Sequence, residues 1–456
     1  GDERTLSYDS PTRQHERAFQ AALELRYELA SGITLRPMSG YQYKRNKYLQ
    51  DIDATQAPLA AGGRQVVDYY ARHRQYSQEI NILSPTEGAF DWILGGYYQQ
   101  SDAAVDYLQI SPLPPVFFVP RNNRKILGAF GQGNYKIAQA VELQLGLRYS
   151  HFKGTSAGSV LVGAGLPGFP PDGLPVADLS GSHNDGRVTG KAAINWEVDD
   201  DNLLYAFAAR GYKPGGFAGA RDFSPETVWS YEIGWKSTLA DGRVRTQVNA
   251  FYNDYRGFQL DVLEPSAGVS SVRNANSTTI KGVEAQVQGR FGGFSFDGAV
   301  GYVDSRLDGL TFVDERRLPP GQLGPQCPPG VPSNPPRCFN YTPFTITTDG
   351  GPNLYSPKWT FNVGAEYRIQ LGEATLTPRV NYGYVGSQFT YLAYRPGDRF
   401  AGRGLLSALL TLEIGDWRVE AYGTNLTDKT YVSGRSDDNE FYGAPQEYGL
   451  RIGARF

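Results

Sequence analysis

Three consecutive segments between residues 225 and 291 alternate strictly between apolar and polar side chains. In the first segment Trp229, Tyr231 and Ile233 are separated by single polar or small residues. Residues 244–253 and 283–291 repeat the pattern, and the tight turn at Asp241-Gly242 separates the first two segments. A side-chain period of two predicts β-strands with one apolar and one polar face, and the turn predicts a hairpin.

The strands fit either a soluble sandwich or a membrane barrel on alternation alone, because both structures have one polar and one apolar face. The length of the strands and the residues at their ends distinguish the sandwich from the barrel. They exceed the roughly 9 residues that a tilted strand needs to cross a bilayer. Aromatic residues gather near their ends, as in the aromatic girdles of membrane barrels. We therefore expect membrane-spanning strands.

Composition supports an all-β chain and excludes several other classes. The 456 residues include 54 Gly, 30 Tyr and 23 Phe but only one Met, a composition typical of strands. No run of 18 or more apolar residues is present, so the sequence predicts no transmembrane helix. The formal net charge of -3 and the lack of a basic run give no indication of a nucleic-acid partner.

Short and long connections alternate along the chain. Short turns are expected at residues 30–32, 86–88, 136–139, 199–202, 240–243, 292–293, 371–373 and 415–416. Long connections are expected at residues 50–73, after residue 98, and at 152–186, 213–225, 260–273, 306–355, 387–403 and 429–447. Bacterial barrels place short turns in the periplasm and long loops outside, which orients the chain and puts its last strand, residues 448–456, towards the periplasm. We predict an antiparallel transmembrane β-barrel with about 17 strands.

The ordered motifs of the chain resemble those of TonB-dependent outer-membrane receptors. Residues 205–217 (YAFAARGYKPGGF) are similar to a characteristic stretch of that family. Later segments match further motifs in order: residues 231–236 (YEIGWK), 251–255 (FYNDY), 281–284 (KGVE), 357–359 (PKW), 425–431 (NLTDKTY) and the terminal Phe456.

The resemblance implies a 22-stranded barrel with an N-terminal plug and a TonB box that couples to the TonB-ExbB-ExbD complex. We expect residues 1–456 to form one barrel domain that is N-terminally incomplete, because neither plug nor box is recognisable. An even strand number also requires an odd number of missing strands, and five would complete the family's barrel. No signal peptide precedes the first strand, so we expect that it was removed or that the N-terminus is missing. Without its missing part the chain would leave two unpaired edges in lipid.

Two further features concern bonds and metals. Cys327 and Cys338 bound a proline-rich segment and predict a local disulfide, with two free thiols as the alternative. The four histidines lack metal-ligand spacing, so we assign no residue to a metal site.

Polar residues at the outer strand ends are the candidate ligand contacts, since cations and amides there could bind an anionic or oxygen-rich ligand. The competing interpretation is that polar residues on the inner face only bind a plug and water. The candidates are Arg210, Tyr212, Arg256, Gln259, Arg273, Asn274 and Gln388.

The resemblance implies a receptor for TonB-dependent uptake, most simply of an iron-siderophore complex, in the bacterial outer membrane. No catalysis and no covalently bound cofactor are expected, and iron would enter only as part of the ligand. The expected partners are TonB-ExbB-ExbD, outer-membrane lipid and the ferric siderophore, with the receptor acting as a monomer. Oligosaccharide, vitamin B12 or haem uptake remains an alternative, as does a passive porin. A soluble propeller-type adhesin would need a repeat of about 40 residues, which is not found.

Overall fold

The computed structural model describes residues 10–51, 56, 66–110, 115–218, 221–263, 270–319, 326–334, 338–436 and 439–455. Almost all regular structure in this part of the chain is β-strand. The only helical elements among the described residues are three single 3-10 turns, η2 (Glu315–Arg317), η3 (Thr342–Phe344) and η4 (Pro396–Asp398). No helix there is long and apolar enough to cross a membrane. Phe456, the last residue of the family motif, lies outside the described residues.

The strands of the main sheet are β1 (Arg13–Glu24), β2 (Tyr27–Glu28), β3 (Thr34–Asp51), β4 (Val66–Leu83), β5 (Phe90–Ile110), β6 (Val116–Phe118), β7 (Arg121–Ala138), β8 (Val141–Ala157), β9 (Ser159–Val162), β10 (Leu174–Asp178), β11 (Gly181–Asp199), β12 (Asn202–Lys213), β15 (Glu226–Leu239), β16 (Val244–Leu263), β17 (Ser270–Phe291), β18 (Phe294–Asp308), β21 (Trp359–Tyr367), β22 (Ile369–Leu371), β23 (Ala374–Val385), β26 (Arg403–Ile414), β27 (Trp417–Thr424) and β30 (Glu447–Ala454). Four small hairpins complete the described part of the chain: β13 (Gly216–Ala218) with β14 (Arg221–Phe223), β19 (Thr311–Val313) with β20 (Thr345–Thr347), β24 (Gln388–Phe389) with β25 (Arg399–Phe400), and β28 (Val432–Ser436) with β29 (Asn439–Tyr442).

The long strands of the main sheet pair in chain order and always antiparallel. The order is β1 with β2, then β3, β4, β5, β7, β8, β11, β12, β15, β16, β17, β18, β21 with β22, β23, β26, β27 and β30. Counting β1 with β2 and β21 with β22 as single strands, and leaving aside the short strands β6, β9 and β10, gives seventeen long strands among the described residues, so the predicted strand number is confirmed.

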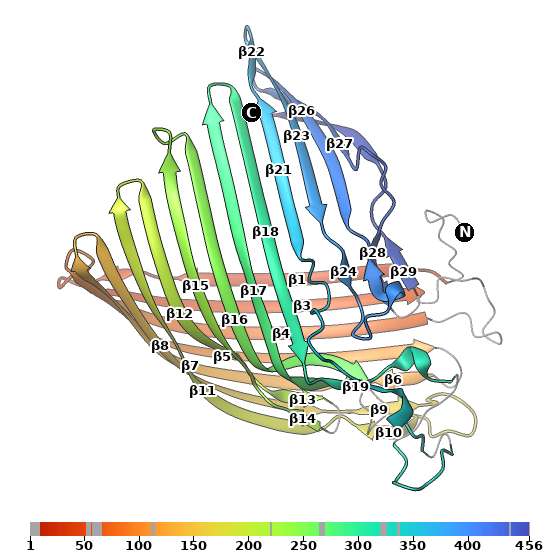
Figure 1. Cartoon of the computed structure of the whole chain (residues 1–456). Helices are drawn as coiled ribbons and strands as arrows, with labels where there is room; N and C mark the ends of the chain where they lie inside the picture. Colours follow the sequence, from red (N-terminus) through yellow and green to blue (C-terminus); the bar gives the residue numbers. More distant parts are fainter. Residues whose placement is uncertain are drawn as a thin grey trace.

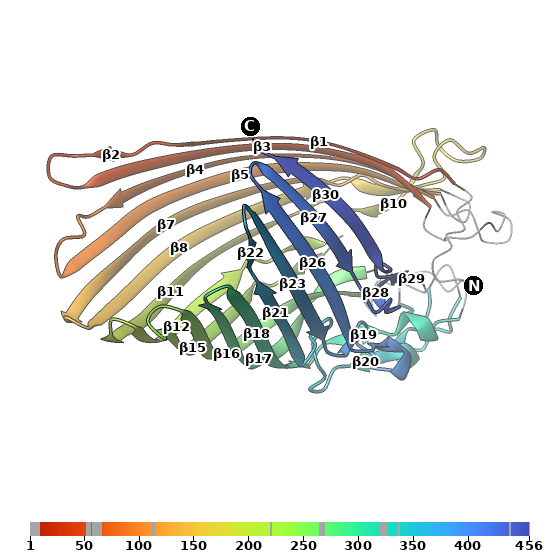
Figure 2. The same ribbon diagram turned by 90° about the horizontal axis from the view of Figure 1, so that it is seen from above.

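The sheet is strongly curved but it is not a closed barrel (Figures 1 and 2). Within the described residues, β1 pairs along its length only with β3, and β30 pairs only with β27, so these two strands form the edges of the sheet. The first strand begins at the end of the sheet that carries the long connections, where Arg13 pairs with Leu49. The last strand ends at the opposite rim, where Ala454 pairs with Trp417 beside a short turn.

The short turns lie where the sequence predicts them. The connection between β15 and β16 is an example: Ala240, Asp241 and Gly242 all have positive φ, and the Arg243 amide donates to the Ala240 carbonyl at 3.2 Å. Such a left-handed turn matches the twist of the flanking strands, and this explains the Asp-Gly sequence.

Several long connections are shorter than predicted, because the strands extend further outwards. The prediction left residues 260–273 as a loop, but β16 runs to Leu263 and β17 begins at Ser270. Likewise, β4 begins at Val66 although the connection was predicted to reach His73. Backbone pairing continues beyond the apolar segment, whereas the alternation of side chains fades once both faces of a strand meet water.

The two faces of the sheet differ as the alternation predicts. Large apolar residues on one face are exposed, for example Trp229 at 45%, Ile233 at 62% and Leu147 at 68%. The opposite face carries polar pairs such as Tyr205 and Glu232, whose hydroxyl and carboxylate are 2.7 Å apart. An exposed apolar face and an internally paired polar face are the pattern of a barrel wall with lipid outside and a polar lumen inside. We call these the outer and the inner face.

Candidate functional site

Three of the long connections at one end of the sheet fold together rather than extend separately. Residues 309–358, 386–402 and 425–446 carry the hairpins β19–β20, β24–β25 and β28–β29, which gather at the same end in Figure 1. We call the described residues of these three connections the outer assembly.

A small hydrophobic core joins two of these connections to the sheet. Leu310 and Phe312 of the first connection and Leu392 of the second are at most 4% exposed. They pack with Val262 of β16 and Ala275 of β17, at the outer ends of these strands. Because burial of each large apolar side chain contributes about 1.5–3 kcal/mol, this core holds the two connections against the wall.

Two buried ion pairs lock the same connections to each other. The carboxylates of Asp314 and Asp398 are fully buried. Arg395 pairs with Asp314, and Arg316 contacts both oxygens of Asp398, with Nη2 2.9 Å from Oδ2. The Arg316 guanidinium also lies 4.1 Å from the centre of the Tyr391 ring. Each connection therefore supplies one carboxylate and one arginine to the other.

The electrostatics of this cluster follow from its burial. Burial alone raises the pKa of Asp398, but hydrogen bonds from Arg316 and from the Arg395 amide outweigh it, and the pKa lies below its usual value. Burial, followed by the nearby Asp308 carboxylate, raises the pKa of Tyr394 to about 12. The Tyr394 hydroxyl thus stays protonated and donates to the Pro352 carbonyl at 2.9 Å.

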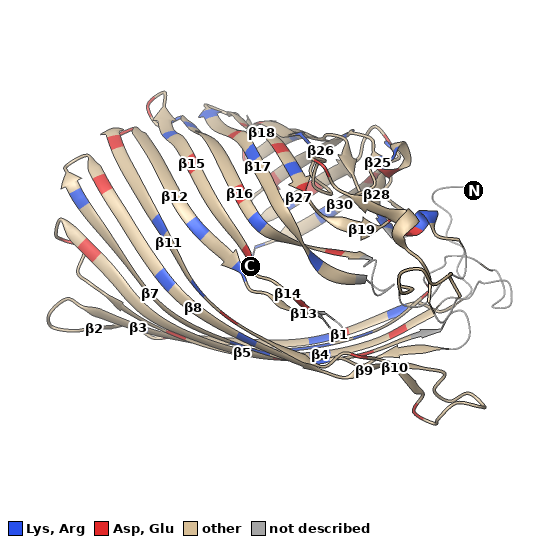
Figure 3. Ribbon diagram, turned by 60° about the horizontal axis from the view of Figure 1, so that its bottom comes forward, with Lys and Arg blue, Asp and Glu red and all other residues tan. Residues whose placement is uncertain are grey.

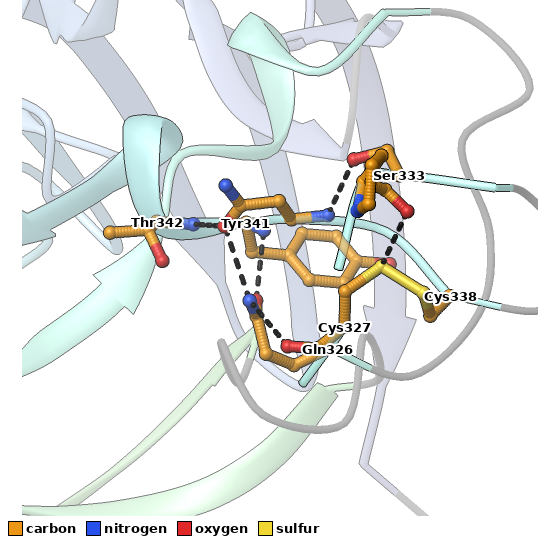
Figure 4. Close-up of a disulfide and its surroundings, with 8 residues drawn as sticks. Gln326, Cys327, Ser333, Cys338, Tyr341 and Thr342 are labelled. Carbon is orange, nitrogen blue, oxygen red and sulfur yellow. Dashed lines mark hydrogen bonds between the residues drawn. A yellow bond between two sulfur atoms is a disulfide. The ribbon is translucent and has the colours of Figure 1, made fainter. Parts of the chain in front are cut away.

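The predicted disulfide is present and closes the segment between Cys327 and Cys338 (Figure 4). Hydrogen bonds fix the chain around it: the Tyr341 amide donates to Gln326 Oε1 at 2.9 Å, and the Asn340 amide donates to Ser333 Oγ at 3.0 Å. The aromatic ring of Tyr341 packs with Phe339 and Val313 in a second small core. The disulfide thereby belongs to the folded part of the outer assembly.

Arg435 attaches the third connection to the second. Its guanidinium donates to the Gly397 carbonyl, pairs with Glu440 of its own hairpin, and lies 5.9 Å from the centre of the Phe400 ring. Arg403, at the start of β26, lies 4.7 Å from the Tyr431 ring. All three connections are therefore linked by side-chain contacts.

The inner face below the outer assembly is hollowed and polar. A cavity of about 800 Å³ runs along β16 to β26 and reaches Arg403 and Tyr431. Farther from the assembly, Arg379 pairs with Asp297 at 2.6 Å and with Glu366 at 3.2 Å. Charged residues of both signs are spread along the sheet in Figure 3. Such a surface suits water, a polar ligand or a protein element inside a barrel.

Four aromatic rings form a continuous ladder at the outer ends of β3, β4, β5 and β6. Tyr48 stacks on Tyr69 with ring centres 4.6 Å apart, Tyr69 meets Tyr107 at 6.4 Å, and Tyr107 meets Phe118 at 5.4 Å. Tyr69 is an odd number of residues from Tyr76, which is 45% exposed on the outer face, so alternation places the ladder on the inner face. We call these four rings the aromatic ladder.

Sequence reasoning missed the aromatic ladder for an identifiable reason. Tyr69 and Tyr107 fell in predicted long connections, whereas the structure places them in paired strands. The one usable signal was the spacing of tyrosines on neighbouring strands, which becomes informative only when the strand register is known.

Gln259 and Asn274, two of the predicted contacts, lie opposite each other in β16 and β17 and brace the wall. Gln259 Nε2 donates to the carbonyls of Pro214 and Ser224 at 3.0 and 3.1 Å. Asn274 accepts from the Ser224 amide at 2.9 Å and donates to the Ser224 and Gly257 carbonyls at 2.9 and 2.6 Å. Both side chains hold the connection between β12 and β15.

Arg210, Tyr212 and Arg256 lie apart from that pair. Arg210 pairs in register with Trp229, so it shares the outer face with that exposed ring. Tyr212 and Arg256 both pair in register with Thr227. Because Thr227 lies two residues from Trp229 on the same strand, these side chains also share the face of that exposed ring. Arg256 also forms an ion pair with Asp254 at 3.2 Å.

The remaining two candidates occupy different elements. Arg273 pairs in register with Leu260 near the outer end of β17. Gln388 begins the small β24 hairpin, opposite Phe400, inside the outer assembly. The structure therefore places Gln259 and Asn274 opposite each other and leaves the other five candidates elsewhere.

An antiparallel sheet of long strands in chain order, with short turns at one rim and folded connections at the other, defines the class of outer-membrane barrel proteins. A comparison with protein families identifies the family within this class of outer-membrane barrels. The family model described as "TonB dependent receptor-like, beta-barrel" matches residues 1–426, and the chain belongs to this family. Members of the family are outer-membrane receptors that bind ligands and couple to TonB for energy.

Curated relatives are receptors. The chain is 27% identical over 278 residues to the pesticin receptor of Yersinia enterocolitica, a match that covers 58% of this chain and 38% of that protein. It is 27% identical over 347 residues to the ferric-pyoverdine M114 receptor PbuA of a Pseudomonas strain, covering 73% of this chain and 36% of that protein. The chain thus spans less than two fifths of the length of these relatives.

Solved structures share the fold. The ferric yersiniabactin uptake receptor FyuA from Yersinia pestis superposes with a TM-score of 0.76 at 18% identity, covering 98% of this chain and 63% of that one. The ferric-catecholate import receptor Fiu from Escherichia coli gives a TM-score of 0.70 at 15% identity, covering 98% and 65%.

Proposed function

We propose that this chain forms barrel wall and outer loops of a receptor that imports a ferric siderophore across the outer membrane. The observation that carries the proposal is the match of residues 1–426 to the receptor family. Two relatives named above are a ferric-pyoverdine receptor and a ferric yersiniabactin receptor, and this favours iron complexes over other cargo.

The aromatic ladder supports the same cargo class. Its four rings lie on the inner face at the rim with the long connections, where an incoming ligand would first meet the barrel. Aromatic rings stack on the flat aromatic groups of many siderophores, and each such contact contributes about 0.5–1.5 kcal/mol beyond area burial. The outer assembly stands at the same rim and would enclose the ligand from one side.

The proposal includes partners and excludes catalysis. The energy would come from the TonB-ExbB-ExbD complex, and the receptor would act as a monomer embedded in outer-membrane lipid. Iron would enter only within the ligand, with no covalently bound cofactor. No group in the proposed mechanism makes or breaks a covalent bond, so the protein would be a transporter and no enzyme.

The test is an uptake assay with the full-length gene in iron-limited medium. A deletion strain, with and without functional TonB, receives radiolabelled iron bound to a panel of siderophores of different chemistry. The proposal requires one or more iron complexes to be taken up only when both the gene and TonB are present.

Two other results would replace the proposal. TonB-dependent uptake of labelled cobalamin, haem or an oligosaccharide, with no iron-siderophore uptake, would identify another nutrient receptor. TonB-independent entry of small solutes would instead indicate a passive porin.

A further inference from the structure

A row of arginines crosses the outer face of the first strands. Arg17 of β1, Arg45 of β3 and Arg72 of β4 are directly opposite one another in the strand register. The row continues through Ala104 of β5 to Arg121 of β7. All four arginines are exposed. We call Arg17, Arg45, Arg72 and Arg121 the arginine row.

The register shows that these side chains share the outer face. Two residues towards the short turns, the next row contains Phe19 and Tyr43, which also pair in register, and Phe19 is 59% exposed. A further step leads to Tyr41, opposite Tyr76, and both of these rings are exposed. Because alternate residues of a strand point to one face, the arginines stand on the same surface as these aromatic rings.

The position of the row corresponds to lipid headgroups. The aromatic rings mark the interface of the apolar band, which continues inwards through exposed residues such as Leu23 and Ile80. Two residues of strand rise about 7 Å, and the polar zone of a bilayer extends roughly 5–7 Å beyond its hydrocarbon core. The arginine row therefore lies at headgroup level, just beyond the aromatic rings.

Like charges face each other here, and the compensating contacts are aromatic rings: Arg45 lies 5.3 Å from the centre of the Tyr70 ring, and Arg74 lies 5.9 Å from that of Tyr43. Directly opposed like charges destabilise an antiparallel pair, yet Arg45 opposes both Arg17 and Arg72. Lys125 and Lys153 repeat this on β7 and β8. Among the described residues, no carboxylate forms an ion pair with Arg45 or Arg72. An external anion would relieve this repulsion.

A hollow in the wall lies beside the row. It has a volume of about 360 Å³, and its lining includes three arginines, Arg72, Arg74 and Arg121, one carboxylate, Asp102, and the small residues Ala104 and Ala157. This space can admit an anionic group between the arginines.

The acidic groups near the hollow are largely engaged. Asp102 faces Arg74 in register and accepts a hydrogen bond from Asn123 at 2.5 Å. Asp106 pairs with Arg121 at 2.5 Å and thereby holds that guanidinium against the wall. Arg72 and Arg74 remain as cations without a carboxylate partner among the described residues.

We propose that the arginine row and its hollow bind the phosphate groups of phosphorylated glycolipid in the outer leaflet. Guanidinium groups donate two parallel hydrogen bonds to phosphate, which makes arginine suited to this anion. Neighbouring strands hold the cations in a line along the membrane surface, where several headgroup phosphates can be contacted at once. The inference adds a lipid site to the proposed receptor and depends on its outer-membrane location, but it is independent of the cargo.

The experiment uses the full-length receptor purified in detergent. Binding of diphosphorylated lipid A, dephosphorylated lipid A and inorganic phosphate is measured for the wild type and for the double variant Arg45→Ala/Arg72→Ala. We expect the wild type to prefer diphosphorylated lipid A by at least tenfold and the double variant to lose at least tenfold in affinity for it. The double variant Arg45→Lys/Arg72→Lys keeps both charges and should lose less than the alanine variant.

A matched control removes two exposed arginines from the opposite rim. Arg243→Ala/Arg368→Ala should bind diphosphorylated lipid A like the wild type, and TonB-dependent uptake in cells verifies that each variant is folded. Equal binding of both lipid forms by the wild type, or unchanged affinity of the alanine variant, would overturn the proposal. Inorganic phosphate that competes as strongly as the lipid would also overturn it, since the site would then recognise a free anion.

Discussion

Arg316 and Asp398 are 82 residues apart in the sequence and form a two-point ion pair whose carboxylate is completely buried. The pair joins the connection after β18 to the connection after β23. Together with the pair of Arg395 and Asp314, it makes two loops into one folded unit. A loop that must close over a ligand would therefore move with its neighbour.

Replacing Arg316 by alanine should loosen this unit. The change leaves the Asp398 carboxylate buried without its main partner, and breaking a buried ion pair typically costs 3–5 kcal/mol. Because Arg316 is 30% exposed, we expect the lower end, about 3 kcal/mol, in the local stability of residues 309–319 and 386–402. Amide hydrogen exchange on the full-length receptor measures it.

The control for this variant is Arg418→Ala. Arg418 pairs with Glu420 at 2.6 Å but is 57% exposed, so its removal should cost less than 1 kcal/mol. Equal exchange rates in the Arg316 and Arg418 variants would show that the buried pair does not hold the loops.

Acid should open the same unit over a defined pH range. The pKa of Asp398 in the folded state is below its unfolded value of about 3.9. A lowered carboxylate pKa contributes stability that is complete above the unfolded pKa and is lost as the pH falls through the folded pKa. We expect constant protease protection of the outer assembly from pH 8 to pH 5 and a loss below about pH 3.9.

The variant Asp398→Asn tests whether this carboxylate is responsible. The amide cannot titrate, so the variant should be less protected at pH 7 and should show a weaker acid effect than the wild type. An acid transition of the same size in both proteins would assign the effect to other groups.

The wall of the barrel was predictable because each strand carries its own signal. Trp229, Tyr231 and Ile233 alternate with polar residues, and the turn at Asp241-Gly242 fixes the register of β15 on β16. Strand number, strand order and the alternation of short and long connections followed from such local patterns.

The outer assembly was not predictable in the same way. Arg316 meets Asp398 and Arg395 meets Asp314 only after two irregular connections have folded together. Neither connection has a periodic side-chain pattern from which these ion pairs could be predicted. Gln259 and Asn274 illustrate the same limit: their residue types suggested ligand contacts, but their partners are the backbone groups of Pro214, Ser224 and Gly257. The sequence shows which residues are polar, but their contacts depend on the register in which the strands pair.

Replacing Asn274 by alanine should destabilise the connection between β12 and β15 and should not act directly on ligand binding. The change removes three hydrogen bonds to Ser224 and Gly257, each contributing about 1 kcal/mol. We expect faster proteolysis within residues 214–224 of the full-length receptor. The control is Asn276→Ala, an exposed residue of the same strand. Loss of ligand affinity with unchanged proteolysis would instead identify Asn274 as a direct ligand contact.

Removing the disulfide should destabilise only its own part of the outer assembly. The two cysteines are 11 residues apart in the sequence, and a disulfide that closes a loop of this size contributes about 3 kcal/mol to the free energy of unfolding. The double variant Cys327→Ser/Cys338→Ser should be cleaved faster by protease around residues 326–341. A reducing agent should produce the same change in the wild type and no change in the variant, and protection equal to that of the oxidised wild type would contradict the prediction.

The aromatic ladder allows the sharpest test of the proposed cargo. Tyr69 is its central ring, in contact with both Tyr48 and Tyr107, so Tyr69→Ala removes the stacking surface at its centre. A stacking contribution of about 0.5–1.5 kcal/mol corresponds to a loss of roughly 2- to 12-fold in affinity for an aromatic ferric siderophore. Tyr69→Phe keeps the ring and should bind nearly as the wild type does.

The matched control for the ladder is Tyr76→Ala, which removes a tyrosine ring from the same strand but from the outer face. Direct titration of the full-length receptor with the ferric siderophore identified in the uptake assay gives the affinities. If Tyr69→Ala and Tyr76→Ala weaken binding equally, the loss comes from the wall as a whole. If Tyr69→Ala alone weakens binding and Tyr69→Phe restores it, the ligand stacks on the inner rim, and the residues that recognise it belong to strands rather than to loops.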